Sequence, residues 1–209
     1  LEEAPAPRLG RPLRRRLADL AVHAARAVGY VNAGTVEFLV DRYGNPFFLE
    51  MNTRLQVEHP VTEMTTGTDI VKEQIRIAAG ERLAWDKPPV AVGHAIECRI
   101  DARDTQRGFA PSPGRITLFV PPGGPGVRCD THIYTGFEVT TFYDPLLAKV
   151  IVHGRDRFEA IRRMQRALRE MRIEGIQTTR DYHLRILSNA FFRRGEVDTS
   201  FLRRHMGDA

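Results

Sequence analysis

Hydrophobic and polar positions follow two different periods along this chain. Apolar residues that recur every three to four positions predict amphipathic helices, and short apolar runs between turn residues predict strands. In the first part of the chain these patterns predict a helix, a hairpin and two shorter helices. Their expected bounds are residues 11–29, 34–41 paired with 47–49, 60–65 and 70–79. The last of these helices is expected to bury Ile70, Val71, Gln74, Ile75 and Ala78 and to expose Lys72, Glu73 and Arg76.

The pattern changes after the polar segment 81–90, which contains Pro88 and Pro89 and is the best candidate for a linker. Beyond it strands come first and helices follow, which is typical of an α+β domain and not of alternating βαβ units. Strands are expected at residues 93–102, 115–120, 127–134, 138–142 and 146–152, and helices at 155–171, 178–189 and 199–204. The helix at 155–171 is expected to bury Phe158, Ile161, Met164, Leu168 and Met171. Two domains are therefore predicted, 1–88 and 89–209, with residues 2–7 as a loop leading into the first.

Polar side chains occupy every second position directly after the apolar run 47–49. They are Glu50, Asn52, Arg54, Gln56 and Glu58. If the chain stays extended here, all five point to one face, because side chains alternate along a strand. The turn at 43–46 also brings Glu37 of the preceding strand near Glu50. Two carboxylates and an amide oxygen suit Mg²⁺, and a guanidinium offers a planar fork to a small oxyanion. The alternative is a solvated edge strand with mixed charges.

Composition narrows the class of protein. The chain has 209 residues and a net charge of +5, but its arginines alternate with Asp and Glu along the predicted helices. Aromatic residues do not interleave with them as in single-strand binders, so no nucleic-acid partner is expected. No apolar run approaches the roughly 18 residues of a membrane helix, and no membrane association is expected. Only Cys98 and Cys129 are present, which favours a reducing, cytoplasmic location. A first residue of Leu1 suggests a processed or truncated product.

The segment 48–63, which reads FLEMNTRLQVEHPVTE, resembles the metal and bicarbonate segment of biotin carboxylase. Its first half, 48–55, is also similar to the carbamoyl-phosphate synthetases and to ATP-grasp enzymes broadly, whereas 56–60 narrows the resemblance to biotin-dependent carboxylases. Further matches follow at 94–100, 111–114 and 143–149. The fold implied is α+β. It would comprise the C-terminal part of an ATP-grasp domain, 1–88, and the mixed sheet and helix domain that ends biotin carboxylase, 89–209.

The resemblance implies ATP- and bicarbonate-dependent carboxylation of biotin on a carrier protein, through carboxyphosphate. Position by position, it implies that two Mg²⁺ or Mn²⁺ ions bind Glu37, Glu50 and Asn52. The ATP contacts implied are Glu37, Leu39, Leu49, Glu50 and Thr199, although an aliphatic residue is expected at position 199. The bicarbonate contacts implied are Arg54, Gln56 and the backbone N–H of Val57.

Three residues carry the chemistry in this resemblance. Glu58 would be the base that deprotonates bicarbonate, Arg99 would stabilise the biotin enolate, and Arg54 would assist. Taken alone, Arg99 is an ordinary strand arginine. His59 receives no catalytic role and is interpreted as a packed or orienting histidine. Arg128 falls at a dimer-interface position, and Asp144 is a landmark of the site to which no chemistry is assigned.

The partners implied are the biotin carboxyl carrier protein, carboxyltransferase subunits and, in the full-length protein, a second copy in a homodimer. The chain is most like the bacterial acetyl-CoA carboxylase subunit, which acts in fatty acid biosynthesis, and the lack of a biotin-attachment segment after Ala209 favours this. Upstream lysines and a glycine-rich lid of the family are missing, so weak or no activity is expected of the chain alone.

Three alternatives remain open. The chain could be a non-catalytic dimerisation or carrier-docking fragment. It could instead be the same domain of a larger acyl-CoA, pyruvate or urea carboxylase. A carbamoyl-phosphate synthetase shares residues 48–55 but does not explain 93–150.

Overall fold

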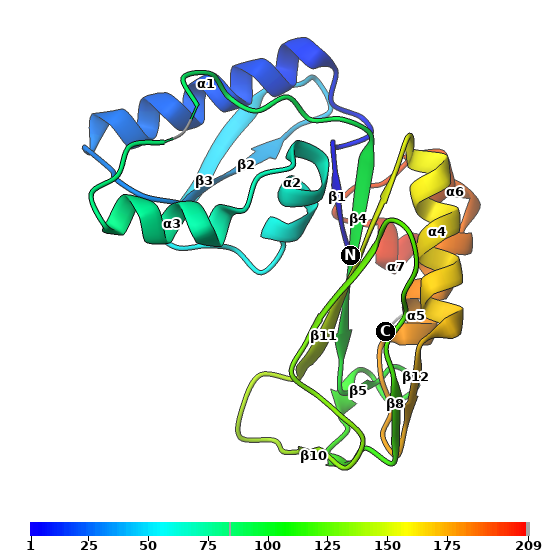
Figure 1. Ribbon diagram of the computed structural model, residues 1–209. Coiled ribbons are helices and arrows are strands. Elements are labelled where there is room, and N and C mark those ends of the chain that lie inside the picture. The colour runs from blue at the N-terminus through cyan, green and yellow to red at the C-terminus, as the bar shows by residue number, and fades with distance from the viewer. Residues whose placement is uncertain (84, 208–209) are drawn as a thin grey trace. The chain divides into compact units, whose positions relative to one another are not determined.

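A computed structural model describes residues 1–83 and 85–207. Within these residues the chain forms two compact units (Figure 1). The hairpin unit is Arg8–Ala91, and the sheet unit consists of Leu1–Pro7 and the described residues from Val92 onward. The division therefore falls close to the segment expected to be a linker, and the domain bounds 1–88 and 89–209 stay a prediction.

The hairpin unit contains the elements that its sequence pattern predicts. In chain order they are α1 (Arg11–Ala27), β2 (Thr35–Val40), β3 (Pro46–Asn52), α2 (His59–Thr66) and α3 (Ile70–Ala78). Gly67 follows α2 in the left-handed conformation, with φ of 69°, as glycine after a helix commonly does. Asp69 caps α3, because its side chain accepts a hydrogen bond from the Lys72 N–H at 2.9 Å. Local signals were enough to locate these boundaries.

Much of the apolar surface of the hairpin unit is exposed. Helix α1 buries none of its residues. On β3, Phe47, Phe48 and Leu49 are each more than half exposed, at 56%, 61% and 55%. Within the described residues the hairpin is a separate sheet of two strands, which is marginal as an isolated structure.

The prediction of which residues α3 buries is wrong. Glu73 is buried and Ile75 is 66% exposed. Two polar contacts accompany this reversal. The Ile70 N–H donates to the Glu63 carboxylate of α2 at 2.7 Å, and Arg76 donates to Glu73 at 2.9 Å. The first contact ties the start of α3 to α2, and the second pairs the buried Glu73 carboxylate, as a charged residue in a buried position requires.

The sheet unit is built on four antiparallel strands in the order β1–β4–β11–β9. Their bounds are β1 (Glu2–Ala4), β4 (His94–Asp101), β9 (Val127–Thr131) and β11 (Leu146–Gly154). The expectation that residues 2–7 form a loop is wrong at Glu2–Ala4, which pairs with β4 and places Glu3 opposite Ile96. Edge pairing supplies backbone hydrogen bonds to a segment whose sequence carries almost no strand signal.

Helix α4 (Arg157–Glu170) contributes to the main core of the sheet unit. Ile161, Met164 and Leu168 join Ile96, Cys98 and Val150 there, all at most 2% exposed. Phe158 was expected in this stripe, but it is 54% exposed. Its ring instead lies under the guanidinium groups of Arg162 and Arg193. Near the start of the helix Ala160 is fully buried instead. The buried apolar stripe of α4 is therefore rotated slightly from the predicted one.

Short strand pairs and three helices complete the sheet unit. The pairs are β5 (Arg103–Asp104) with β6 (Ala110–Pro111), β7 (Gly114–Arg115) with β10 (Glu138–Val139), and β8 (Leu118–Val120) with β12 (Arg172–Glu174). The helices are α5 (Arg180–Ser188), α6 (Ala190–Arg193) and α7 (Phe201–His205). A second core gathers Ala102, Ile116, Ile133, Val139 and Leu147. The α+β prediction is confirmed.

Candidate active site

The two hairpin carboxylates face each other, as the sequence predicted. Glu37 of β2 and Glu50 of β3 are register partners. Asn52 lies at the end of β3, and its Nδ2 donates to Glu37 Oε1 at 3.0 Å and to Glu50 Oε1 at 2.9 Å. A β-bulge lies next to this pair. Phe38 is opposite Phe48, which leaves Leu49 as the extra residue of β3. Leu39 and Leu49 are both about half exposed, at 51% and 55%.

The donor set fits a hard divalent cation. An N–H group held between two carboxylate oxygens occupies the place where a cation would satisfy both of them. Glu37, Glu50 and, after rotation of its amide, Asn52 would offer only oxygen ligands, which Mg²⁺ and Mn²⁺ prefer. Across residues 1–83 and 85–207 no group of three or more His, Cys, Asp and Glu could hold a metal ion. A site with two carboxylates leaves its other positions to water and phosphate, as nucleotide-bound Mg²⁺ requires.

The alternating polar residues converge by a different route from the one predicted. The single extended face over residues 50–58 is wrong beyond Asn52, where β3 ends. Glu58 occupies the cap position of α2 instead. The chain turns because Pro60 favours a helix start and the Val61 N–H bonds the Glu58 carbonyl at 3.2 Å.

Gln56 nevertheless joins the two halves of the candidate site. Its side-chain Nε2 donates to Glu37 Oε1 at 2.9 Å, and its Oε1 accepts from Arg54 Nη1 at 2.9 Å. The same Arg54 nitrogen reaches the Leu55 carbonyl at 3.2 Å. The metal carboxylates and the guanidinium are thus connected through one amide side chain.

A pocket of about 350 Å³ lies beside this turn. It is lined by Ala33, Gly34, Thr35, Val36, Leu55, Gln56, Glu58, His59, Thr62 and Ile70. Val57 and Glu58 are both half-buried. Gln56 and Glu58 therefore lie at a concave surface that can receive a small ligand, and Val57 is the residue between them.

Arg99 lies in the sheet unit, on β4. Its Nη2 is 3.1 Å from Glu2 Oε1, so strand β1 supplies an ion-pair partner. Its backbone carbonyl accepts hydrogen bonds from Thr179 Oγ1 at 2.9 Å and from His183 Nε2 at 2.7 Å. Burial lowers the pKa of His183 to about 4, so this imidazole is neutral near pH 7 and donates through Nε2. Sequence reasoning missed all three supporting residues, because no local pattern links positions about 80 or more apart.

Thr199 also lies in the sheet unit, and it is exposed. It borders a pocket of about 440 Å³ with a mostly apolar lining that includes Leu1, Ile186, Phe192 and Phe201. An aliphatic residue was expected at this position, and the structure places threonine at the rim of an apolar hollow.

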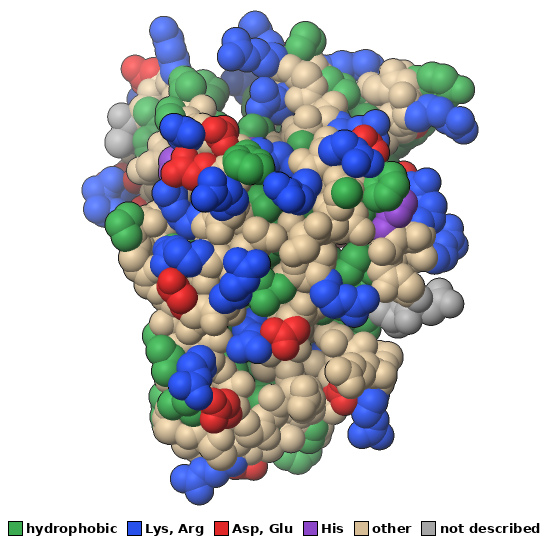
Figure 2. Space-filling model, turned by 90° about the vertical axis from the view of Figure 1, so that its right-hand side faces the viewer, with side chains coloured by type: hydrophobic (Ala, Val, Ile, Leu, Met, Phe, Trp, Pro, Cys, Tyr) green, Lys and Arg blue, Asp and Glu red, His purple; other side chains and the backbone are tan. Residues whose placement is uncertain are grey.

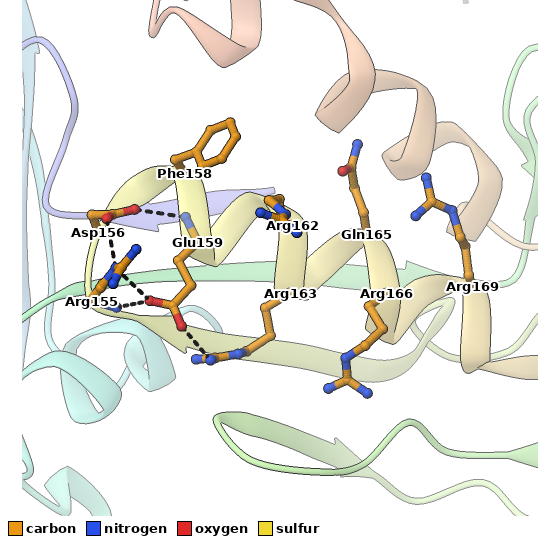
Figure 3. Close-up of a pocket in the computed structure, with 9 residues that line it drawn as sticks. All are labelled: Arg155, Asp156, Phe158, Glu159, Arg162, Arg163, Gln165, Arg166 and Arg169. Atoms are coloured by element: carbon orange, nitrogen blue, oxygen red, sulfur yellow. Dashed lines mark hydrogen bonds and ion pairs between the residues drawn. The ribbon is translucent and has the colours of Figure 1, made fainter.

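A third hollow, about 640 Å³, runs along α4 and is lined largely by arginines (Figure 3). Several of these are paired with carboxylates of the same helix. Arg163 reaches Glu159 at 2.7 Å and Arg166 reaches Glu170 at 2.7 Å, both four residues apart. Such pairs are typical of a solvated helix face. On the face of the molecule in Figure 2, Lys and Arg side chains are likewise scattered among acidic and uncharged surface.

Comparison with protein families accounts for nearly the whole chain. The family model described as "Biotin carboxylase C-terminal domain" matches residues 97–204, and the one described as "Carbamoyl-phosphate synthase L chain, ATP binding domain" matches residues 1–85. The chain belongs to the biotin carboxylase family. Residues 1–85 match the part that this family shares with carbamoyl-phosphate synthases. Residues 97–204, which a carbamoyl-phosphate synthetase does not explain, match the biotin carboxylase domain.

Relatives of this family match over almost the entire chain. The biotin carboxylase of Nostoc sp. is 55% identical over 204 residues, covering 97% of the chain and 46% of the relative. A pyruvate carboxylase subunit from Methanothermobacter thermautotrophicus is 53% identical over 203 residues, covering 97% and 41%. The chain thus spans less than half the length of these two relatives.

Solved structures agree. The biotin carboxylase domain dimer of Hydrogenobacter thermophilus 2-oxoglutarate carboxylase, in complex with MgADP, ADP and bicarbonate, is 46% identical. It superposes with a TM-score of 0.95 over 98% of this chain and 45% of its own. Biotin carboxylase from Campylobacter jejuni, in a β,γ-ATP complex, is 46% identical with a TM-score of 0.93, over 97% and 45%. Within residues 1–83 and 85–207, no helix has the length and hydropathy of a membrane span.

Proposed function

We propose that this chain is the part of a biotin carboxylase that holds the metal, bicarbonate and biotin residues. The whole protein would carboxylate biotin on a carrier protein, using ATP and bicarbonate. The observation that carries the proposal is the connection through Gln56, which binds the carboxylate of Glu37 and the guanidinium of Arg54 at once. A site of this form handles a metal-bound phosphate and a small anion side by side. The related 2-oxoglutarate carboxylase domain was solved with MgADP and bicarbonate, which supports both ligands.

The roles follow from the chemistry of each side chain. Two divalent ions held by Glu37, Glu50 and Asn52 would neutralise phosphate charge. Arg54 pairs with bicarbonate and Gln56 orients it, with the Val57 N–H as a further donor. Glu58 accepts the proton of the bicarbonate hydroxyl, so that the oxygen forms a bond to the terminal phosphorus of ATP while the bond to ADP breaks. The product is carboxyphosphate.

Biotin carboxylation then requires a cation where negative charge develops on the ureido oxygen. We assign this to Arg99, whose backbone is fixed by hydrogen bonds from Thr179 and α5 and whose guanidinium pairs with Glu2. Leu39, Leu49 and Thr199 would contact adenine. Asp144 accepts from the Leu146 N–H at 2.9 Å, which is a contact within a turn, and it receives no catalytic role.

Partners and location extend the same proposal. The carrier protein, carboxyltransferase subunits and a second copy would bind the whole protein, with Arg128 on the dimer surface. Arg128 Nε lies 2.8 Å from Asp130 Oδ1 on the same strand, which fixes its direction. Cys98 and Cys129 are free thiols, and burial raises their pKa to about 12 and about 11. Unreactive reduced thiols support a cytoplasmic protein.

The carboxylase that this part serves has two candidates. An acetyl-CoA carboxylase, acting in fatty acid biosynthesis, is the candidate that the sequence resemblance favours. A pyruvate carboxylase is supported by the 53% identity to the Methanothermobacter protein. Purification of the whole protein from its cells, followed by identification of the bound carboxyltransferase, distinguishes them.

A chimera tests the catalytic proposal. This chain replaces the matching 204 residues of the Nostoc enzyme, and ¹⁴C from bicarbonate is followed into free biotin with ATP present. Activity is expected in the chimera and is expected to fall at least about a hundredfold with Glu58→Gln, which keeps the shape but not the base. Equal activity in both would contradict the proposal. A folded chimera that binds MgATP but never fixes ¹⁴C would favour a non-catalytic docking fragment.

A further inference from the structure

His59 lies directly behind the turn that carries the proposed anion ligands. Its ring Nδ1 is 2.8 Å from the Gln56 carbonyl oxygen. A carbonyl only accepts, so Nδ1 carries the proton and donates it. The His59 backbone N–H approaches the same oxygen at 3.3 Å. One residue therefore holds the Gln56 peptide from two directions, and its side chain is only 12% exposed.

A small displacement of Gln56 would affect both the proposed metal ligands and the proposed anion ligands. Its amide joins Glu37 of the proposed metal pair to Arg54 of the proposed anion pair, each at 2.9 Å. A turn that shifted by about 1 Å would break hydrogen bonds whose normal range is only about 2.7–3.2 Å. The geometry of both halves of the site thus depends on the position of one peptide.

Glu63 supports His59 from the other side. It is buried, and its Oε2 lies 3.8 Å from His59 Nε2, an ion pair whenever the imidazole is protonated. Its Oε1 accepts from the Ile70 N–H of α3 at 2.7 Å. Glu63 and His59 are four residues apart on α2, so the helix itself sets their spacing. The turn is in this way connected to two helices of the hairpin unit.

We propose that His59 is a positioning residue of the bicarbonate site, which it serves by holding the Gln56 carbonyl through Nδ1 with Glu63 behind it. This inference rests on the proposed function. It assigns His59 no contact with substrate. The active form of the side chain is the one with a proton on Nδ1, and the group that it positions is the Gln56 amide between Glu37 and Arg54.

Two substitutions separate this role from simple packing. In His59→Asn the side-chain Nδ2 stands the same number of bonds from the backbone as Nδ1 and can still donate to Gln56. In His59→Gln the nitrogen stands where Nε2 was, so it faces Glu63 and the bond to Gln56 is lost. A role in filling space alone would be served at least as well by the longer Gln.

The test is a titration of ¹³C-bicarbonate into the full chain, followed by NMR, with thermal unfolding by circular dichroism as the folding control. His59→Gln is expected to weaken bicarbonate binding about tenfold, which is near the upper end of the net contribution of one hydrogen bond. His59→Asn is expected to weaken it by less than about threefold. Equal weakening by both variants, or none by either, would overturn the proposal.

A second readout decides the matter even if the unsubstituted chain binds no bicarbonate, a result that would count against the proposed function itself. The ¹³C resonance of the Gln56 carbonyl reports its hydrogen bond directly. It is expected to move in His59→Gln and to stay in place in His59→Asn. An unmoved Gln56 carbonyl in His59→Gln would show that His59 does not hold this peptide, and the inference would be wrong whatever the ligand.

Discussion

His183 makes a direct prediction about pH and stability. The imidazole is only 7% exposed, its Nε2 donates to the Arg99 carbonyl at 2.7 Å, and its Nδ1 has no hydrogen-bond partner among the described residues. Burial lowers its pKa to about 4 from an ordinary value of 6.5. Protonation of the folded sheet unit would place a charge in a core where Nδ1 lacks an acceptor. The neutral ring is therefore part of the native structure.

The sign of the effect follows from which state takes up the proton. As pH falls below 6.5 the unfolded chain protonates His183 while the folded chain does not, so stability decreases with decreasing pH until about pH 4. The pKa difference of about two and a half corresponds to roughly 3 kcal/mol of unfolding free energy lost across this window. Above pH 7 the group contributes no pH dependence.

The assay is urea unfolding followed by far-ultraviolet circular dichroism between pH 7.5 and 4. His183→Gln is the matched variant, because Gln keeps a donor at the position of Nε2 and does not titrate. The difference in unfolding free energy between the two proteins is expected to shrink by roughly 3 kcal/mol from pH 7 to pH 4. Fluorescence of Trp85, the single tryptophan, reports the hairpin unit and serves as the control for changes elsewhere. A difference that stays constant with pH would refute the buried, neutral histidine.

Two further predictions concern the sheet unit. Glu3 accepts hydrogen bonds from Arg157 at 2.7 and 3.0 Å and lies 2.8 Å from His94. Glu3→Gln is therefore expected to lower the free energy of unfolding, measured by urea titration, by about 3 kcal/mol. An unchanged urea midpoint would exclude this network as a stabilising contact. Gly175 has φ of 101°, and an added Cβ would meet the Arg115 carbonyl oxygen at 2.1 Å. Gly175→Ala is expected to lower the free energy of unfolding by at least about 2 kcal/mol, which thermal unfolding detects as a lower melting temperature. Gly123→Ala, with open space around it, should change this free energy by less than about 0.5 kcal/mol. Equal effects of the two alanines would contradict this explanation.

Local signals in the sequence were sufficient for the hairpin and for the pairing of Glu37 with Glu50. The turn before β3 and the apolar runs around it determine that register within about fifteen residues. The gathering of Arg54 and Gln56 was also predicted, but for the wrong reason, since side-chain hydrogen bonds bring them together after the strand has ended. Alternation of polar and apolar residues does not show where a strand ends and a helix begins.

The failures have a common cause. Glu73 of α3 is buried with Arg76 as its partner, and Phe158 of α4 lies exposed beneath Arg162 and Arg193. At each of these positions a polar or cation–ring contact is present where hydrophobic periodicity gives the wrong exposure. Similarly, Glu2, Thr179 and His183 reach Arg99 only through tertiary structure. Residues that support a site from distant parts of the chain leave no local pattern in a single sequence.

The proposed function depends on Glu37, Glu50 and Asn52 forming a working metal and nucleotide site within this chain. Calorimetric titration of MgATP examines this site without intermediate steps, with Glu50→Gln as the isosteric variant and Glu81→Gln, at an exposed carboxylate of the same unit, as the matched control. Binding is expected for the unsubstituted chain and for Glu81→Gln, and loss of binding is expected for Glu50→Gln. Equal binding by all three proteins would contradict the assignment of this metal site, and binding by none while circular dichroism shows them folded would mean that the nucleotide site needs the upstream part of the family's enzyme.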